Sequence, residues 1–337
     1  MDEERWNEVL RPHTTGEGWQ PCGDSFYRMH KVYMNMGWYN PDDVMKSISL
    51  GDYIHAVAPY GGPVALTLDR TKVTEVHGMH EVTNVKIFSP AGYRMGTIKW
   101  TGDRNIVGLV WASAEHLIIV QEDGACQVHN VTGGFLHAIP PRAELRIGVT
   151  KKLPIGTAVK ATHMAVSWDE EKVAVFHEGM IRVYAKNFTD LKYELDTDTN
   201  VEPTSIVWCG SHSVVAYWDE EKMPSGMLLV VPGSRHQTTF SYVNRVILCP
   251  EMDGLRVISD EEHEFLQPVP DEMWSTFLAG DTGESKLYQA RVFYEDRSPL
   301  ADELLRSVKD AGPDAMVQAV QSLMVAAEHE WDPRLIR

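Results

Sequence analysis

The sequence has few cysteines, no long apolar run and a deficit of positive charge, and each shortage excludes a class of protein. No stretch approaches the roughly 20 apolar residues that span a bilayer, and the acidic N-terminus MDEERWNEVL lacks the order of a secretory signal. We therefore expect a cytoplasmic protein without direct membrane insertion. The four cysteines form no C-x-x-C pair and have no histidine at zinc-finger spacing, which argues against a zinc site or disulfide framework and favours buried thiols: Cys22, Cys126, Cys209 and Cys249.

The charge balance bears on possible partners. Acidic residues outnumber basic residues 48 to 31, which gives a formal net charge of -17. This charge repels a phosphate backbone, so nucleic acid is not an expected partner. No Lys/Arg run of the length that binds an anionic membrane surface is present, so any membrane association would pass through other proteins.

Motifs that carry common enzyme chemistry are missing from the sequence. It contains no G-x-S-x-G elbow, no P-loop and no G-x-G-x-x-G after a strand, and its histidines do not form a zincin pair. We therefore predict a protein that is not an enzyme and that has no cofactor or metal. A propeller hydrolase stays open as an alternative, and it would need convergent carboxylates with raised pKa values.

Two copies of the sequence WDEEK stand 50 residues apart, each at the end of a strand-like run. Charged turns of this kind are usually solvated, but rim charges can also steer a basic partner during association. We predict no catalytic residue and name six acidic side chains as candidate contact points for a protein partner: Asp169, Glu170, Glu171, Asp219, Glu220 and Glu221.

The chain from about residue 53 to about residue 265 consists of short apolar runs separated by turn residues, with many β-branched and aromatic residues. Tight turns are marked by Asp123-Gly124, Glu178-Gly179 and Asp253-Gly254, because glycine tolerates the positive φ that such turns demand. The pattern predicts an all-β region.

Three segments of this region resemble one another: VWASAEHLIIVQEDGACQVHNV, VSWDEEKVAVFHEGMIRVY and VWCGSHSVVAYWDE. Their tryptophans Trp111, Trp168 and Trp208 lie 57 and 40 positions apart, near the length of one four-stranded propeller blade. Blades stacked around an axis bury both faces of each sheet, whereas a single sheet cannot. We expect a β-propeller, with a β-sandwich as the alternative.

After Pro270 the pattern becomes helical. The segment ESKLYQARVFYED, from Glu284, has apolar residues at helical spacing. Pro299 and Pro313 then open two further segments of this kind, and Gly312 ends the first of these two. Helices with an apolar stripe of this kind pack against neighbouring helices, as in a solenoid. The predicted domains are an N-terminal extension at residues 1–22, a β-propeller at residues 23–270 and the start of an α-helical solenoid at residues 271–337.

Three motifs carry a resemblance to a known family: APYGGPVALTLD, IVGLVWASAEHLIIVQEDG and CPEMDGLRVISDEEHEFLQPVP. Together with GDSFYRMHKVYMNMGW and LYQARVFYEDRSPLADELL, they resemble the N-terminal region of the vacuolar protein sorting-associated subunit sixteen. The resemblance runs, with interruptions, over nearly the whole chain. It implies an N-terminal propeller followed by a long α-solenoid.

The resemblance also implies a function. Family members are core subunits of the HOPS and CORVET tethering complexes, which bridge late endosomal, lysosomal or vacuolar membranes and promote SNARE assembly through a bound Sec-one/Munc-eighteen-type protein. The implied protein is a scaffold subunit, peripheral on these membranes through its partners, which are the other tethering subunits. A free-standing propeller that binds a peptide on its end face is the alternative from a different class.

The chain departs from the family pattern in two places. Between Pro140 and Thr162 it offers only about twenty residues where the family supplies further strands, so we expect a propeller with at least one blade missing. A gapped ring leaves unpaired strand edges. The helical region stops after its first helices, so we expect a shortened subunit that cannot recruit the Sec-one/Munc-eighteen-type partner by itself.

Overall fold

The structure is a computed structural model that describes residues 19–23, 25–34, 36, 49–72, 84–102, 104–112, 115–141, 161–223, 226–233, 235–278 and 280–329. The described chain divides into two compact units. One comprises residues 29–267, and the other comprises the residues described up to 28 together with those from 268 onward. The segment at residues 142–160, where the blade is expected to be missing, lies outside the described residues.

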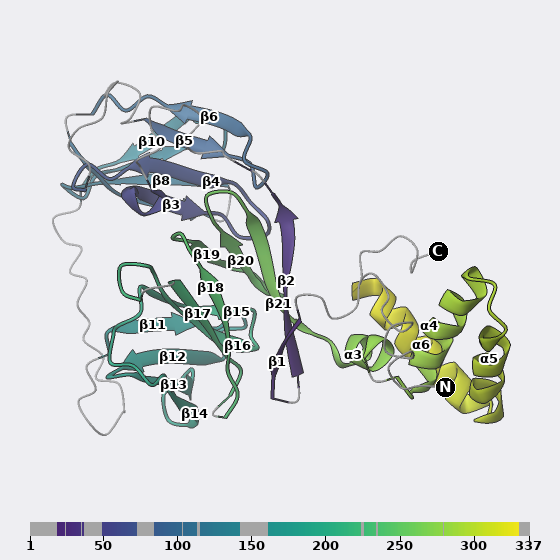
Figure 1. Cartoon of the computed structure of the whole chain (residues 1–337). Coiled ribbons are helices and arrows are strands. Elements are labelled where there is room, and N and C mark those ends of the chain that lie inside the picture. Colours follow the sequence, from purple (N-terminus) through teal and green to yellow (C-terminus); the bar gives the residue numbers. More distant parts are fainter. Residues whose placement is uncertain are drawn as a thin grey trace. The chain divides into compact units, whose positions relative to one another are not determined.

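Five small antiparallel sheets account for the strands (Figure 1). We number them in chain order as sheets 1 to 5, with a short 3-10 turn at Leu50–Asp52 before sheet 1. Sheet 1 contains β3 (Tyr53–Val57), β4 (Val64–Leu68), β5 (Val85–Phe88) and β6 (Arg94–Ile98). Sheet 2 contains β7 (Ile106–Ala112), β8 (His116–Gln121), β9 (Cys126–His129) and β10 (Phe135–Ile139).

Sheets 3 and 4 repeat this pattern of four strands in chain order. Sheet 3 contains β11 (His163–Val166), β12 (Lys172–His177), β13 (Met180–Ala185) and β14 (Leu191–Asp196). Sheet 4 contains β15 (Ser205–Cys209), β16 (Ser213–Trp218), β17 (Gly226–Val231) and β18 (Thr238–Tyr242). The second strand of sheet 4 is buried along its whole length, because apolar side chains cover both faces of the sheet there.

Sheet 5 combines the two ends of the β region. It contains β19 (Ile247–Pro250), β20 (Leu255–Ile258), β21 (His263–Val269), β2 (Ser25–Tyr33) and β1 (Trp19–Cys22), in the order β1-β2-β21-β20-β19. β2 therefore pairs with β21, and the strands β19 to β21 of this sheet lie more than two hundred residues later in the chain. Such a strand joins the beginning of the β region to its end by main-chain hydrogen bonds.

Most consecutive sheets pack face to face, and their inner strands lie side by side. β3 contacts β7, β11 contacts β15, and β15 contacts β19. Apolar clusters fill the junctions between sheets 5 and 1, 1 and 2, and 3 and 4. Within the described chain, β7 and β11 make no comparable contact, so sheets 2 and 3 are not joined in the same way.

Two tryptophans hold neighbouring sheets together at equivalent places. The indole Nε1 of Trp111 in β7 donates to the carbonyl oxygen of Ala56 at 3.1 Å, and that of Trp208 in β15 donates to the carbonyl oxygen of Ala165 at 3.1 Å. Both bonds run to the inner strand of the preceding sheet. The register places Val166, not Trp168, at this position in sheet 3. The tryptophan repeat expected from the sequence thus has two equivalent members.

The predicted turn glycines serve two purposes. Gly124 and Gly179 have φ values of 82° and 78°, as the tight turns require. Gly254 is not in the left-handed region, but a Cβ there would lie 2.5 Å from the carbonyl oxygen of Leu266, so close packing of the backbone requires glycine.

Four helices follow the sheets: α3 (Asp271–Phe277), α4 (Gly283–Glu295), α5 (Leu300–Asp310) and α6 (Pro313–His329). The last three coincide with the helical segments expected from the sequence, whereas α3 was not predicted. Thr282 caps α4 by accepting a hydrogen bond from the Ser285 amide. Among the described residues, none of the helices has the length and apolar character needed to cross a membrane.

The helical unit has its own core. Val269, Met273, Phe277, Tyr288 and Ala326 form a buried cluster, and the side chains of Trp19 and Phe26 pack against it. The expectation of an all-β region followed by helices is therefore confirmed at the level of five antiparallel sheets and four helices.

Candidate functional site

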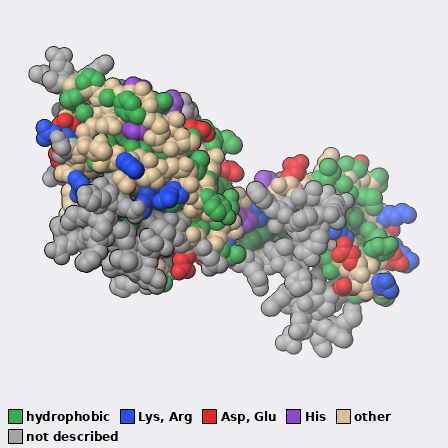
Figure 2. Space-filling view, turned by 90° about the horizontal axis from the view of Figure 1, so that it is seen from above, with side chains coloured by type: hydrophobic (Ala, Val, Ile, Leu, Met, Phe, Trp, Pro, Cys, Tyr) green, Lys and Arg blue, Asp and Glu red, His purple; other side chains and the backbone are tan. Residues whose placement is uncertain are grey.

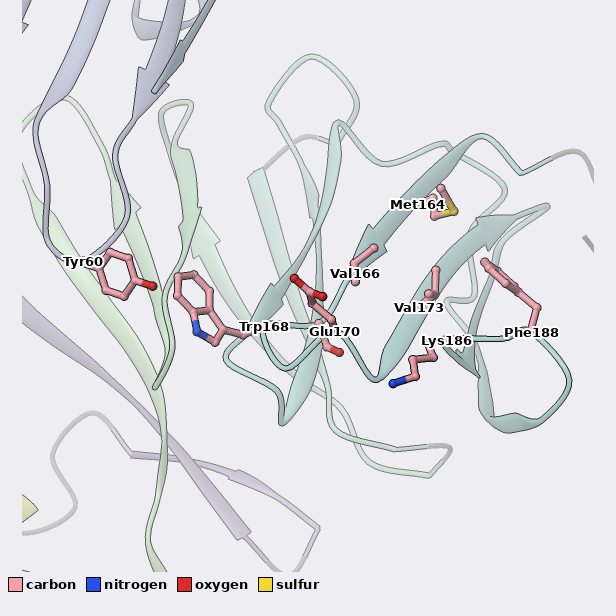
Figure 3. Close-up of a pocket in the computed structure, with 9 residues that line it drawn as sticks. Tyr60, Met164, Val166, Trp168, Glu170, Val173, Lys186 and Phe188 are labelled. Carbon is pink, nitrogen blue, oxygen red and sulfur yellow. The ribbon is translucent and has the colours of Figure 1, made fainter. Parts of the chain in front are cut away.

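An open pocket of about 830 Å³ lies on sheet 3 (Figure 3). Its lining is mostly apolar, with one carboxylate and one ammonium group. The lining residues are Tyr60, Met164, Val166, Ser167, Trp168, Glu170, Val173, Lys186 and Phe188.

Strand alternation explains why apolar side chains form the floor of the pocket. Met164 pairs with Val175 and Val166 pairs with Val173, so these four side chains project from one face of sheet 3. Val173 and Val175 are buried, whereas Met164 and Val166 in the inner strand are 58% and 54% exposed. Phe188, from the turn between β13 and β14, packs on Val173 and Tyr184.

Two aromatic rings form one end of the pocket. Tyr60, in the turn between β3 and β4, meets Trp168 in an edge-to-face contact with 5.4 Å between ring centroids. Figure 3 shows the two rings next to each other, with the strands of sheet 3 to one side. Tyr60 is 78% exposed, an unusual position for a large aromatic side chain. Exposed aromatic rings of this kind provide contact area with few rotatable bonds.

A buried charged pair holds the turn that carries Tyr60. The carboxylate of Glu251 accepts hydrogen bonds from the backbone amides of Tyr60 at 2.6 Å and Gly61 at 3.0 Å. Arg256 lies 3.4 Å from this carboxylate and donates to the carbonyl oxygens of Ala58 at 2.9 Å and Gly62 at 3.1 Å. Because every group of the pair is hydrogen-bonded, it fixes the turn rigidly.

His263 completes this network from sheet 5. Its Nδ1 lies 3.0 Å from the carbonyl oxygen of Pro90, and its Nε2 accepts a hydrogen bond from Arg256 Nε at 3.0 Å. The ring is therefore neutral, with its proton on Nδ1. Burial, with a contribution from the nearby Arg256 charge, lowers the pKa of His263 to about 4 despite the hydrogen bond to Pro90.

The first acidic group predicted from the sequence lies in the turn between β11 and β12, beside the pocket. Asp169 accepts a hydrogen bond from Ser167 at 2.6 Å, and this bond lowers the pKa of its carboxyl group. Glu171 forms an ion pair with Lys186. Glu170, at a φ of 59°, lines the pocket with an exposed side chain.

The second acidic group lies in the turn between β16 and β17, and its members differ in exposure. Asp219 is buried, with Oδ2 3.4 Å from Arg245 Nη1, whereas Glu220 and Glu221 are exposed. The structure does not bring the two groups into one site. The buried carboxylate of Asp219 is not accessible at the surface of the described chain, whereas the side chains of Glu220 and Glu221 are.

The described residues include possible metal ligands and four free thiols. No cluster of three or more histidine, cysteine or carboxylate side chains with metal-binding geometry occurs among them. Cys22, Cys209 and Cys249 are buried free thiols, and burial raises the pKa of Cys209 to about 12. Cys126 is partly exposed.

Sequence reasoning identified the acidic turn but not the aromatic end of the pocket. The segment Pro59-Tyr60-Gly61-Gly62 is recognisable as a turn, but nothing in it indicates that Tyr60 meets Trp168. That contact depends on Glu251 and Arg256, which lie about 190 residues away.

Comparisons with known proteins define the family. The family model described as Vps16, N-terminal region, matches residues 15–149 and 143–336. Protein VACUOLELESS1 of Arabidopsis thaliana is 24% identical over 416 residues, covering 93% of this chain and 46% of the relative. The vacuolar protein sorting-associated protein 16 homolog of Dictyostelium discoideum is 24% identical over 398 residues, with the same coverage of both chains.

The chain thus spans about half the length of the curated relatives it matches. Among solved structures, KlHsv2 with loop 6CD replaced by a Gly-Ser linker has 12% identity and a TM-score of 0.34, covering 65% of this chain and 85% of that one, a likeness too weak to define a fold. The family model covers nearly the whole chain, which confirms the resemblance found in the sequence motifs: the chain belongs to the Vps16 N-terminal-region family.

Proposed function

We propose that this chain is a non-catalytic scaffold subunit of a membrane-tethering complex that acts in vesicle transport and in endosome, lysosome or vacuole fusion, upstream of SNARE assembly. The observation that carries the proposal is the family match over both the sheets and the helices. Its partners are the other subunits of HOPS-type or CORVET-type complexes. It acts in the cytoplasm, peripheral on late endosomal and lysosomal membranes through those partners.

The five sheets are proposed to be the blades of an incomplete β-propeller. Support comes from their repeated four-stranded order, from the face-to-face junctions, and from the tryptophan hydrogen bonds at two of these junctions. The pairing of the N-terminal strand β2 with β21 is the arrangement by which propellers join their first and last blades. Rigid blades of this kind provide faces for protein contacts.

The helices are proposed to be the first layers of an α-solenoid. On α6, the apolar side chains Val317, Val320 and Met324 are 56%, 43% and 61% exposed. Figure 2 shows hydrophobic side chains at the surface of the helical unit. A solenoid leaves such a stripe open for the next repeat, whereas a terminal repeat covers it with polar residues. We expect the Sec-one/Munc-eighteen-type partner to bind only a form with the family's longer α-solenoid.

The pocket on sheet 3 favours a second candidate, a free-standing propeller that binds a peptide. Its exposed Tyr60, its apolar floor and the Glu170 carboxylate suit an extended segment with apolar and basic side chains. The two candidates differ in which surface binds protein. The tether uses the helices and whole blade faces, whereas the free-standing module uses the pocket.

Affinity capture of the tagged chain from cells, followed by mass spectrometry, tests the proposal. We expect tethering-complex subunits to be captured, and a V320D/M324D variant on α6 to capture fewer of them. A Tyr60→Ala variant at the pocket serves as the matched comparison and should capture them normally. Loss with Tyr60→Ala alone would favour the peptide-binding module. Absence of all tethering subunits, for this chain and for a version extended by the family's solenoid, would refute the tether.

A further inference from the structure

Each filled junction between sheets uses two kinds of sheet face. We call the face toward the preceding sheet in chain order the backward face and the face toward the following sheet the forward face. Ala65 and Ile87 of sheet 1 meet Leu117 and Ile119 of sheet 2 in this way. The same pairing of a forward with a backward face occurs between sheets 3 and 4, where Trp208 is 1% exposed.

The forward face of sheet 2 is apolar and has no sheet packed on it among the described residues. Its members follow from the strand register, in which Val110 pairs with Ile118 and Val120 pairs with Cys126. Val110 is 53% exposed. The apolar members of this face are Val110, Ile118, Val120, Cys126, Val128 and Ile139; Val128 is buried, and His137 lies beside it on the same face.

The backward face of sheet 3 also has no sheet packed on it among the described residues. Val166 occupies the position that Trp111 and Trp208 occupy in sheets 2 and 4, yet it is 54% exposed. The apolar members of this face are Met164, Val166, Val173, Val175, Tyr184 and Phe188, and they include the floor of the pocket; Arg182 lies on the same face. Val173, Val175 and Tyr184 are buried, so Met164 and Val166 in the inner strand form most of the exposed apolar surface. Exposed apolar surface next to a pocket is typical of an interaction site.

The relatives indicate what covers these faces elsewhere in the family. The Arabidopsis alignment runs over 416 residues, although 93% of this 337-residue chain supplies only about 313 of them. About 100 positions are therefore filled by the relative alone, which corresponds to about two blades of four strands. The family model also matches the chain in two segments, which overlap at residues 143–149, between β10 and β11.

We propose that the forward face of sheet 2 in one copy of this chain packs against the backward face of sheet 3 in a second copy. In this architecture a forward face is covered by a backward face, as the filled junctions of the chain itself demonstrate. Among the described sheets, these two faces alone lack such a partner sheet. The sheet 3 face of a second copy covers the sheet 2 face of the first copy. Because the contact joins two different faces, it is head-to-tail, and it repeats the face-to-face packing of sheets within one chain.

Charge does not oppose this contact. The exposed side chains of the inner strands are apolar on both faces: Val110, Met164 and Val166. The charged residues that the register places on the sheet 3 face, Arg182 and Glu194, lie on the outer strands β13 and β14 and pair with each other at 3.2 Å. Glu170 lines the pocket from the turn at the end of β11. Packing one face on the other removes Val110 and Val166 from water, and an aspartate at either position would be buried without a counter-charge. A single aspartate is therefore expected to disrupt the contact.

Sedimentation velocity of the full chain over about two decades of concentration tests the proposal. We expect the mean mass to rise above that of one chain as concentration increases. Val110→Asp and Val166→Asp, each alone, should weaken this association at least about tenfold. Val243→Asp, at a residue 89% exposed between β18 and β19, is the matched control and should leave association unchanged. Circular dichroism melts verify that each variant folds.

Mixing the two disrupted variants distinguishes this pairing from others. The Val110→Asp chain keeps an intact sheet 3 face, and the Val166→Asp chain keeps an intact sheet 2 face, so the mixture should associate although neither variant does so alone. A monomeric wild-type chain at all concentrations would overturn the proposal. So would a Val110→Asp chain that associates normally by itself, since association would then not depend on the sheet 2 face.

Disulfide trapping provides an independent readout. Cys126 is a partly exposed thiol on the forward face of sheet 2, while Cys22, Cys209 and Cys249 are buried. In a Met164→Cys variant, mild oxidation should produce a disulfide-linked dimer on a non-reducing gel. A product linked only within one chain would mean that sheets 2 and 3 close on each other, which would refute pairing between copies.

Discussion

Removing the guanidinium group of Arg256 tests how the turn that carries Tyr60 is held. Arg256 is 2% exposed, and Arg256→Met would leave the Glu251 carboxylate buried without its counter-charge. It would also leave the carbonyl oxygens of Ala58 and Gly62 without their donors. Breaking a buried ion pair at one partner costs about 3–5 kcal/mol in the free energy of unfolding. For a unit of this size, that loss lowers the Tm by about 6–20 °C.

The measurement is urea and thermal unfolding followed by tryptophan fluorescence, with Arg182→Met as the matched control. Arg182 pairs with Glu194 at 3.2 Å at the surface, where such pairs contribute about 0–1 kcal/mol. Adding Glu251→Gln to Arg256→Met should recover part of the loss, because no unpaired charge stays buried. A loss from Arg256→Met no larger than that of the control would contradict the buried network.

Three further predictions address the packing and its pH dependence. Trp208→Phe removes the donor to the Ala165 carbonyl oxygen, so the free energy of unfolding should fall by about 1–3 kcal/mol, and an unchanged urea midpoint would refute this. The pKa of His263 is lowered to about 4 in the folded chain, so its contribution to stability is complete above pH 6.5 and is lost as the pH falls toward 4. The free energy of unfolding should therefore fall by about 3 kcal/mol between pH 6.5 and pH 4. A His263→Gln variant should lose less over the same range, as measured by urea midpoints at these two pH values. Gly179→Ala forces a side chain at a φ of 78° and 2.7 Å from the Thr199 carbonyl oxygen, and should lower the Tm, whereas Gly233→Ala, with open space around it, should not.

Local pattern was sufficient to predict many, but not all, of the elements of this protein. Short apolar runs separated by turn residues indicated the all-β region, and Pro299, Gly312 and Pro313 marked the ends of two helices, because these signals depend only on neighbouring residues. The family resemblance was also readable from the motifs. The short helix α3, with seven residues and no capping side chain, carries too little periodicity to be found this way.

The repeat of tryptophans shows where local pattern fails. Trp111, Trp168 and Trp208 look alike in sequence, but the hydrogen bonds at sheet junctions assign an equivalent place to Trp111 and Trp208 and give that place in sheet 3 to Val166. A shift of two residues along a strand keeps the same face but changes the cross-strand partner. Only the register of the folded sheets distinguishes these positions.

The sequence by itself determined the strands, the later helices, the acidic turns and the family, because each is written in residues close together along the chain. The tertiary structure decided which of these residues meet. Tyr60 reaches Trp168 because Glu251 and Arg256 hold its turn from sheet 5. Asp219, in the turn between β16 and β17, is buried beside Arg245, whereas Asp169, in the turn between β11 and β12, is exposed. The two identical WDEEK segments thus occupy different turns of their sheets, and burial follows that position and not the local sequence.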